Sequence, residues 1–281
     1  MNAPLFPDLA GLEPGWVWLA GAGPGDPGLV TLYVLQGLAQ ADVVVYDALV
    51  GPEILRFARP GAILHFAGKR GGKPSPRQRD ISAFLIAQAR AGRRVMRLKG
   101  GDPLVFGRGG EEARALVAAG IPFRIVPGIS AGIGGLAYAG IPATDRSTNS
   151  AVTFLSAYGA GGGLPRDVDW EGIARCGALV VFMALSRIDE ITARLIAHGR
   201  SADEPVAVVS NATLPGQKVL ESTLGRVTAD LVEHPMPAPA MLVVGEVVRL
   251  RASLDWVGAM AHGRALDPDP LGLGDDNREA C

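Results

Sequence analysis

Residues 97–112 read RLKGGDPLVFGRGGEE, a stretch in which an apolar segment runs into a turn of glycine, aspartate and proline. Gly100 and Gly101 let the backbone bend where side chains would obstruct it, and Pro103 fixes φ at about −65° after the bend. Asp102 adds hydrogen-bond acceptors to the turn. Such a turn exposes main chain to a ligand. A purely structural strand-to-helix connection is the alternative, since Gly and Pro occur in turns of every kind.

On both sides of this turn, short β-rich segments alternate with segments of helical periodicity. The segments that we expect to form strands are 16–20, 42–46, 62–67, 94–98 and 123–126. The helical segments between them are 29–40, 52–58, 75–91 and 108–119. This alternation predicts a mostly parallel sheet covered by helices.

After Pro127-Gly128 the sequence becomes small and glycine-rich, and we place the junction between two α/β domains there. The second series of expected strands is 151–157, 178–183, 206–210, 218–223 and 241–248, with a helix at 187–198. We therefore predict an α/β fold with a mostly parallel N-terminal sheet and a mixed C-terminal sheet. The predicted boundaries are an N-terminal extension at 1–14, domains at 15–127 and 128–250, and a largely disordered tail at 251–281.

The composition is that of a globular protein: of 281 residues, 48% are apolar and 20% are charged. The formal net charge of −1 gives no overall attraction to nucleic acid or to an anionic membrane. Cys176, Cys281 and four scattered histidines indicate neither a disulfide framework nor a metal site. Because we find no signal peptide and no apolar run near the ~18 residues of a membrane span, we expect a soluble cytoplasmic protein.

The segment 21–26, GAGPGD, follows the first expected strand and approximates the GxGxxG fingerprint of dinucleotide binding. Asp26 stands where that fingerprint requires glycine, and Pro24 lacks a backbone donor that a phosphate would use. The turn therefore suits a ligand without phosphates.

The chain resembles the uroporphyrinogen-III C-methyltransferases, within the tetrapyrrole methylases that use S-adenosylmethionine. The resemblance covers residues 15–250 and rests on GAGPGDP at 21–27, VYD at 45–47, GKR at 68–70, the stretch 97–112, VPGISA at 126–131 and AGIP at 139–142. It implies transfer of two methyl groups to C2 and C7 of uroporphyrinogen III, giving precorrin-2 via precorrin-1, with S-adenosylhomocysteine as product. It further implies a homodimer, and an active-site cleft between two α/β domains. The product serves cobalamin, sirohaem or haem d1 biosynthesis.

The same resemblance implies roles for individual residues. Asp47 is the implied proton acceptor and Lys69 the donor, with Arg108 and Glu111 completing the catalytic set. The implied cofactor contacts are small or apolar residues at strand ends, namely Pro24, Gly100, Gly101, Asp102, Val105, Ser130, Ala131, Met183, Ala212 and Ala240. Uroporphyrinogen III carries eight carboxylates, and we expect arginine and lysine side chains to pair with them, arginine through two parallel hydrogen bonds. The candidates are Lys69, Arg70, Arg108 and Arg146.

Each of these residues has a structural alternative. Asp47 is also suited to cap the next helix or to hold an arginine. Met183 is suited to fill the core, and any single arginine is more often a solvated surface group. Glu111 and Glu112 are candidates to orient Arg108 or to accept from pyrrole NH groups, and equally to stabilise the start of a helix.

The chain departs from the family pattern at three places on the expected substrate side. Pro74 and Asp145 stand where histidine is common, and Ser156-Ala157-Tyr158 replaces a frequent Thr-Gly-His. These differences leave the substrate contacts open. The alternative functions are methylation of a later corrin intermediate and tetrapyrrole binding without catalysis. GKR at 68–70 and GRGGEE at 107–112 favour uroporphyrinogen over the first of them.

Overall fold

The computed structural model describes residues 8–68, 77–159 and 161–274. The chain divides between Ala131 and Gly132 into two compact units. In the described ranges, none of the helices has the length and apolar character that a membrane span requires.

The first unit is built around a parallel sheet of five strands in the order β3-β2-β4-β1-β5. The strands are β1 (Val17–Gly21), β2 (Val43–Tyr46), β3 (Ile63–Phe66), β4 (Val95–Lys99) and β5 (Phe123–Val126). The helices are η1 (Pro27–Leu29), α1 (Leu32–Gln40), α2 (Pro52–Leu55), α3 (Gln78–Arg90) and α4 (Gly109–Ala118). The predicted parallel sheet with alternating helices is confirmed.

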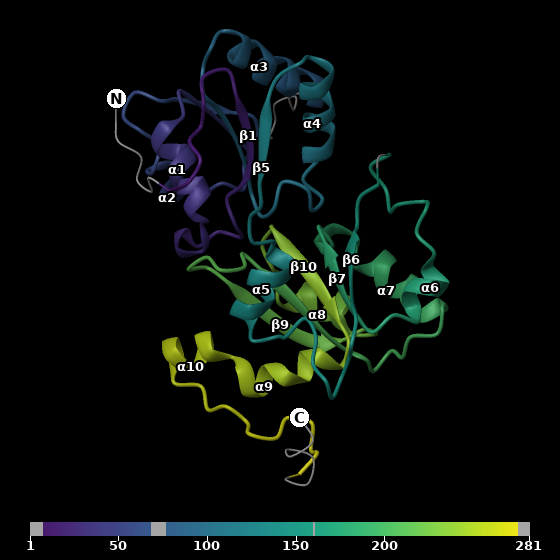
Figure 1. The fold of residues 1–281 in the computed structure, drawn as a ribbon. Helices are drawn as coiled ribbons and strands as arrows, with labels where there is room; N and C mark the ends of the chain where they lie inside the picture. Colours follow the sequence, from purple (N-terminus) through teal and green to yellow (C-terminus); the bar gives the residue numbers. More distant parts are fainter. Residues whose placement is uncertain (1–7, 69–76, 160, 275–281) are drawn as a thin grey trace. The chain divides into compact units, whose positions relative to one another are not determined.

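Alternate residues of each strand face opposite helical layers, as the period of two in a strand requires. Trp18 and Ala20 of β1 pack in a core with α1 and α2, whereas Val17 and Leu19 pack in a core with α3 and α4. Figure 1 shows these two helix pairs on either side of β1 and β5. Because all five strands are parallel, the loops that follow them meet at one edge of the sheet, where open α/β sheets bind ligands.

The second unit contains a mixed sheet in the order β6-β7-β10-β8-β9, in which only β6 and β7 pair in parallel. The strands are β6 (Val152–Ser156), β7 (Ala178–Phe182), β8 (Pro205–Ser210), β9 (Lys218–Thr223) and β10 (Ala240–Val244). One face packs against α6 (Trp170–Ala174), α7 (Ile188–Ala197) and α8 (Val227–Glu233). The other face packs against α5 (Ala131–Ala139) and η3 (Glu246–Leu250), so the predicted mixed sheet is confirmed.

The glycine-rich segment that suggests a domain junction forms helix α5. Its glycines allow the helix to approach the sheet closely: a Cβ at Gly132 would lie 2.7 Å from the ring of Phe182. The small side chains therefore reflect close packing as well as a boundary.

The prediction that the chain is largely disordered from residue 251 onward is wrong for residues 251–262. These residues form α9 (Arg251–Leu254) and α10 (Trp256–His262). The buried guanidinium of Arg251 donates to Asp255 at 2.8 Å, and the indole of Trp256 donates to the carbonyl of Ala137 at 2.9 Å. Composition indicates disorder only where charges and polar groups lack such partners.

Candidate active site

Four glycines bring main chain together at the carboxyl edge of the parallel sheet. Gly23 and Gly101 exchange backbone hydrogen bonds of 3.2 and 2.7 Å. A Cβ at either Gly21 or Gly128 would collide with the carbonyl oxygen of Gly101. Gly101 itself has a φ of +67°, a conformation that side chains disfavour. The edge is therefore a floor of closely packed main chain, and it is open at Gly101, where an added Cβ would have no neighbour closer than 3.9 Å.

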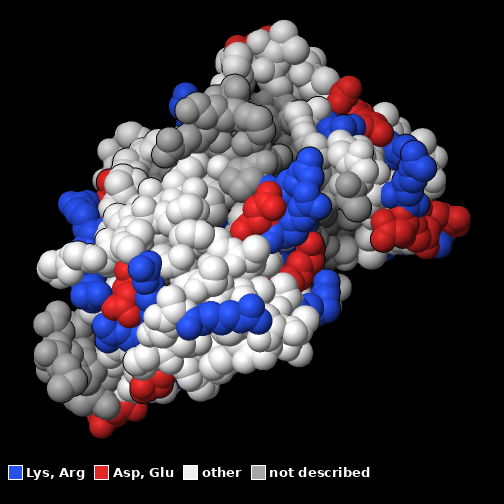
Figure 2. Space-filling view, turned by 90° about the horizontal axis from the view of Figure 1, so that it is seen from above, with Lys and Arg blue, Asp and Glu red and all other residues white. Residues whose placement is uncertain are grey.

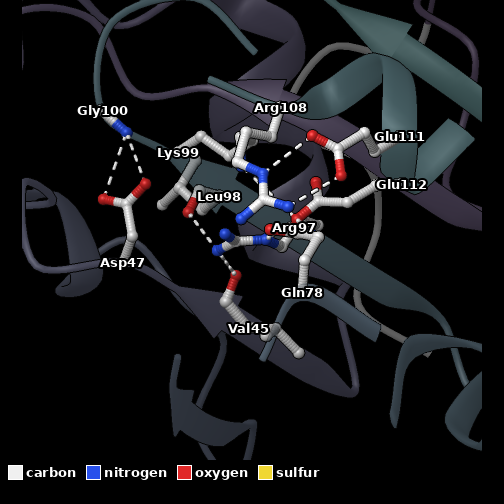
Figure 3. A network of polar contacts seen from close by, with 10 residues as sticks. All are labelled: Val45, Asp47, Gln78, Arg97, Leu98, Lys99, Gly100, Arg108, Glu111 and Glu112. Atoms are coloured by element: carbon white, nitrogen blue, oxygen red, sulfur yellow. Dashed lines mark hydrogen bonds and ion pairs between the residues drawn. The ribbon is translucent and has the colours of Figure 1, made fainter. Parts of the chain in front are cut away.

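Two aspartates hold this floor in place through main-chain donors. The carboxylate of Asp102 accepts from the backbone N–H groups of Leu104 at 2.8 Å and Gly128 at 3.0 Å. Asp47, at the end of β2, accepts from the N–H of Leu49 at 3.0 Å and from that of Gly100 at 3.3 Å (Figure 3). The structure thus brings Asp47 against the turn at 100–102, which carries three of the expected cofactor contacts.

Arg108 and Glu111 form an exposed, forked ion pair at the start of α4. Nε and Nη2 of Arg108 donate to the two carboxylate oxygens at 2.8 and 2.7 Å. This hydrogen bond lowers the pKa of Glu111 and raises that of Arg108. The pair borders a hollow of about 560 Å³ between α3 and α4, whose cationic lining residues are Arg77, Arg79 and Arg108. The expectation that Glu111 orients Arg108 therefore fits the geometry.

Glu112 turns the opposite way, which corrects the expectation that it orients Arg108. Its fully buried side chain accepts from Arg97 at 3.0 Å and from Lys99 at 3.4 Å (Figure 3). The sequence did hold a signal for this contact: Arg97 and Lys99 alternate in an otherwise apolar strand, so both face α4.

Strained backbone gathers after three strands. Among the described residues, five non-glycine residues have positive φ: Phe106, Arg108, Met183, Asn211 and Thr213. They follow β4, β7 or β8. Because such conformations persist only where the surrounding structure enforces them, this distribution marks these loops as candidate functional segments.

Three expected cofactor residues share one edge of the second sheet. Met183 follows β7, Ala212 follows β8 and Ala240 begins β10. Met241 pairs with Phe182, and Ala240 pairs with Ser210, so the three positions meet where these strands end or begin. Met183 is 45% exposed, which excludes the alternative that it fills the core.

The remaining expected site residues lie in different surroundings. Ser130 is buried, Pro24, Val105 and Ala131 are half-buried, and Arg146 is exposed in the loop after α5. Lys69, Arg70 and Pro74 lie outside the described residues.

Comparisons with known proteins agree on one family. The sequence profile of the tetrapyrrole (corrin/porphyrin) methylases matches residues 17–228. A uroporphyrinogen-III C-methyltransferase of Sinorhizobium sp is 62% identical over 268 residues, covering 95% of each chain. Siroheme synthase 1 of Yersinia enterocolitica is 46% identical over 92% of this chain, which spans 54% of that relative's length. The crystal structure of a uroporphyrin-III C-methyl transferase from Thermus thermophilus, complexed with S-adenyl homocysteine, superposes with a TM-score of 0.73 at 38% identity, covering 83% of this chain and 99% of that chain.

Proposed function

The chain belongs to the tetrapyrrole methylases, and we propose that it transfers methyl groups from S-adenosylmethionine to C2 and C7 of uroporphyrinogen III, giving precorrin-2 via precorrin-1. The observation that carries this proposal is the 62% identity to the Sinorhizobium enzyme across 95% of both chains. The candidate site supplies the chemistry that such a reaction needs.

The bare floor at the carboxyl edge of the parallel sheet fits the methyl donor. When bound, the cofactor supplies a methyl group on a positively charged sulfur, which leaves with the electrons of the broken bond. The protein's task is to orient the partners and exclude water. At Gly101 no side chain crowds the backbone: an added Cβ would have no neighbour closer than 3.9 Å, so a ligand can approach it closely. Gly100 and Asp102 are proposed to contact the cofactor from the same turn. Pro24, Val105, Ser130, Ala131, Met183, Ala212 and Ala240 complete the proposed cofactor contacts.

Arg108 is the proposed partner of substrate carboxylates in the first unit. Its side chain is 57% exposed and borders the hollow between α3 and α4, so a carboxylate can reach it. A planar guanidinium binds a carboxylate through two parallel hydrogen bonds. Arg70 and Arg146 are proposed to bind further carboxylates.

The surface charge does not favour nucleic acid as the substrate. On the face shown in Figure 2, the basic side chains (blue) and acidic side chains (red) are interspersed. Nucleic-acid-binding surfaces typically carry a stripe of positive charge.

Asp47 is the proposed proton acceptor. Each methylation of a ring carbon adds one methyl group to the macrocycle and releases one proton, which a carboxylate at the site can accept. Lys69 is the proposed proton donor. In an Asp47→Asn variant the amide oxygen can still accept from Leu49 and Gly100, but the basic group is lost. We expect slowed single-turnover methyl transfer with unchanged S-adenosylhomocysteine affinity and melting temperature. Parent-like transfer would contradict the role.

The function is tested by anaerobic incubation with uroporphyrinogen III and S-adenosylmethionine, followed by mass spectrometry. We expect the substrate to gain two methyl groups. Binding of both ligands without any mass gain would instead indicate a non-catalytic tetrapyrrole-binding protein. A methyl gain only on a later corrin intermediate would favour the related enzyme class.

We further infer a homodimer in the cytoplasm. The family resemblance supports the dimer, and the presence of only two cysteines in the sequence suits a reducing compartment. Light scattering of the purified protein tests the oligomeric state, and a monomer at micromolar concentration would contradict it.

A further inference from the structure

A buried polar cluster lies directly behind the candidate active site. It consists of Gln78, Arg97, Lys99 and Glu112, which we name the strand-end cluster. The side chains of Gln78, Arg97 and Lys99 donate to Oε1 of Glu112 at 2.8, 3.0 and 3.4 Å (Figure 3). Arg97, Lys99 and Glu112 are 3%, 4% and 0% exposed. Two buried cations therefore share one carboxylate.

Burying three charged side chains together has a large desolvation cost, so we expect the strand-end cluster to serve a role. A buried ion needs both a counter-charge and hydrogen bonds to offset the loss of its water shell. Glu112 supplies the negative charge that both cations contact directly. Without it, Arg97 and Lys99 would repel each other in a dry environment, and at least one side chain would have to move.

The strand-end cluster is connected to the proposed reacting groups through main chain. Nη1 of Arg97 donates to the carbonyl of Val45 in β2 and to that of Leu98 in β4, both at 3.3 Å. Val45 lies two residues before Asp47. Lys99 immediately precedes Gly100, whose N–H donates to Asp47. A displacement of Arg97 or Lys99 would therefore change how Asp47 lies relative to the turn at 100–102.

We propose that Glu112 is a positioning residue, which neutralises Arg97 and Lys99 and so fixes the ends of β2 and β4 that carry Asp47 and the turn at 100–102. The proposal rests on the proposed function, because Asp47 and this turn are its reacting edge. Glu112 itself touches neither substrate nor cofactor. It acts through the two cations and the backbone to which they are attached.

The proposal is tested with the Glu112→Gln variant, which keeps the size and an acceptor oxygen but removes the charge. We expect kcat to fall by about tenfold to a hundredfold at a temperature where the variant is fully folded, as for a small misplacement of reacting groups. KM for the tetrapyrrole should change little, because Arg108 and its surroundings are retained. The Lys99→Met/Glu112→Gln double variant removes one of the unneutralised cations and should recover most of kcat.

Glu204→Gln is the matched control, because Glu204 is also a carboxylate paired with a buried arginine, Arg200. Glu204 precedes the amino end of β8, whereas the proposed cofactor residue Ala212 follows the other end of that strand. This control should lower the melting temperature without lowering kcat. The proposal is overturned if Glu112→Gln keeps the parent kcat, if Glu204→Gln lowers kcat equally, or if the double variant recovers nothing. Absence of methyl transfer by the parent enzyme would instead reject the proposed function. S-adenosylhomocysteine titration of both Glu112 variants gives a second readout that does not depend on turnover.

Discussion

Glu111 and Glu112 are neighbours in sequence, yet their side chains leave helix α4 in different directions, one to the surface and one to the interior. Glu111 is half-exposed and pairs with Arg108 beside the hollow between α3 and α4. Glu112 is fully buried and pairs with Arg97 and Lys99 beneath the sheet edge. One helical step of about 100° is enough to separate a surface pair from an interior one.

The two carboxylates differ in what their loss would cost. An exposed pair is worth roughly 0–1 kcal/mol, because water and salt compete with it. Removal of one partner from a buried pair costs about 3–5 kcal/mol, because the other charge remains buried and unpaired. We therefore expect Glu112 to govern the fold and the geometry of the site, and Glu111 to tune Arg108 at its surface.

The largest expected effect is the loss of stability in Glu112→Ala, about 3–5 kcal/mol by denaturant unfolding at pH 7. This loss should shrink as the pH rises. Burial and Arg97 lower the pKa of Lys99, whereas Glu112 and Asp47 raise it, so removal of Glu112 lowers the pKa further. A folded-state pKa below the unfolded value of about 10.4 makes stability rise with pH between the two values. A difference from the parent that stays constant up to pH 10 would contradict this account.

Arg108→Ala should lower kcat/KM for the tetrapyrrole by about thirtyfold to a thousandfold, equivalent to roughly 2–4 kcal/mol for a lost charge-assisted pair. S-adenosylhomocysteine affinity should not change. Arg108→Lys should recover only part of the activity, because an ammonium lacks the planar fork. Arg90→Ala, at the far end of α3, is the control in steady-state kinetics. Parent-like values for both Arg108 variants would make Arg108 a surface group only.

Gly101→Ala should weaken S-adenosylhomocysteine binding in calorimetric titration, because the added methyl group would occupy space that we assign to the cofactor. The matched control is Gly120→Ala: both glycines have a φ of +67° and no neighbour closer than 3.9 Å to an added Cβ. Both variants should therefore lose a similar stability, about 1–2 kcal/mol. Equal affinity in the two variants would remove the turn at 100–102 from the cofactor site.

The smallest expected effect is that of Glu111→Gln, below about 1 kcal/mol in unfolding free energy. Its kcat/KM should fall only modestly, because Arg108 keeps its charge and loses one orienting partner. The difference from the parent should diminish in high salt, which screens exposed pairs. A stability loss as large as that expected for Glu112→Ala would contradict the distinction between the exposed and the buried carboxylate.

Local sequence pattern was sufficient for the sheets but not for the direction of each charged side chain. The strands of the parallel sheet follow from apolar segments separated by helical periodicity, and those segments agree with β1 to β5. The turn at 100–102 was recognisable because glycine, aspartate and proline have distinct backbone preferences. The contact of Glu112 with Arg97 depends on the rotation of α4 against the sheet, which is set by tertiary packing. Helices α9 and α10 do not follow from local composition, because their charged side chains pair with residues distant in sequence, such as Glu221.

The most direct test of the central claim is to follow a carbon-13-labelled methyl group from S-adenosylmethionine into the tetrapyrrole under anaerobic conditions. We expect nuclear magnetic resonance of the product to show two labelled methyl groups, bonded to ring carbons C2 and C7. Label attached to a carboxylate oxygen or a pyrrole nitrogen, or no label in the tetrapyrrole at all, would contradict it.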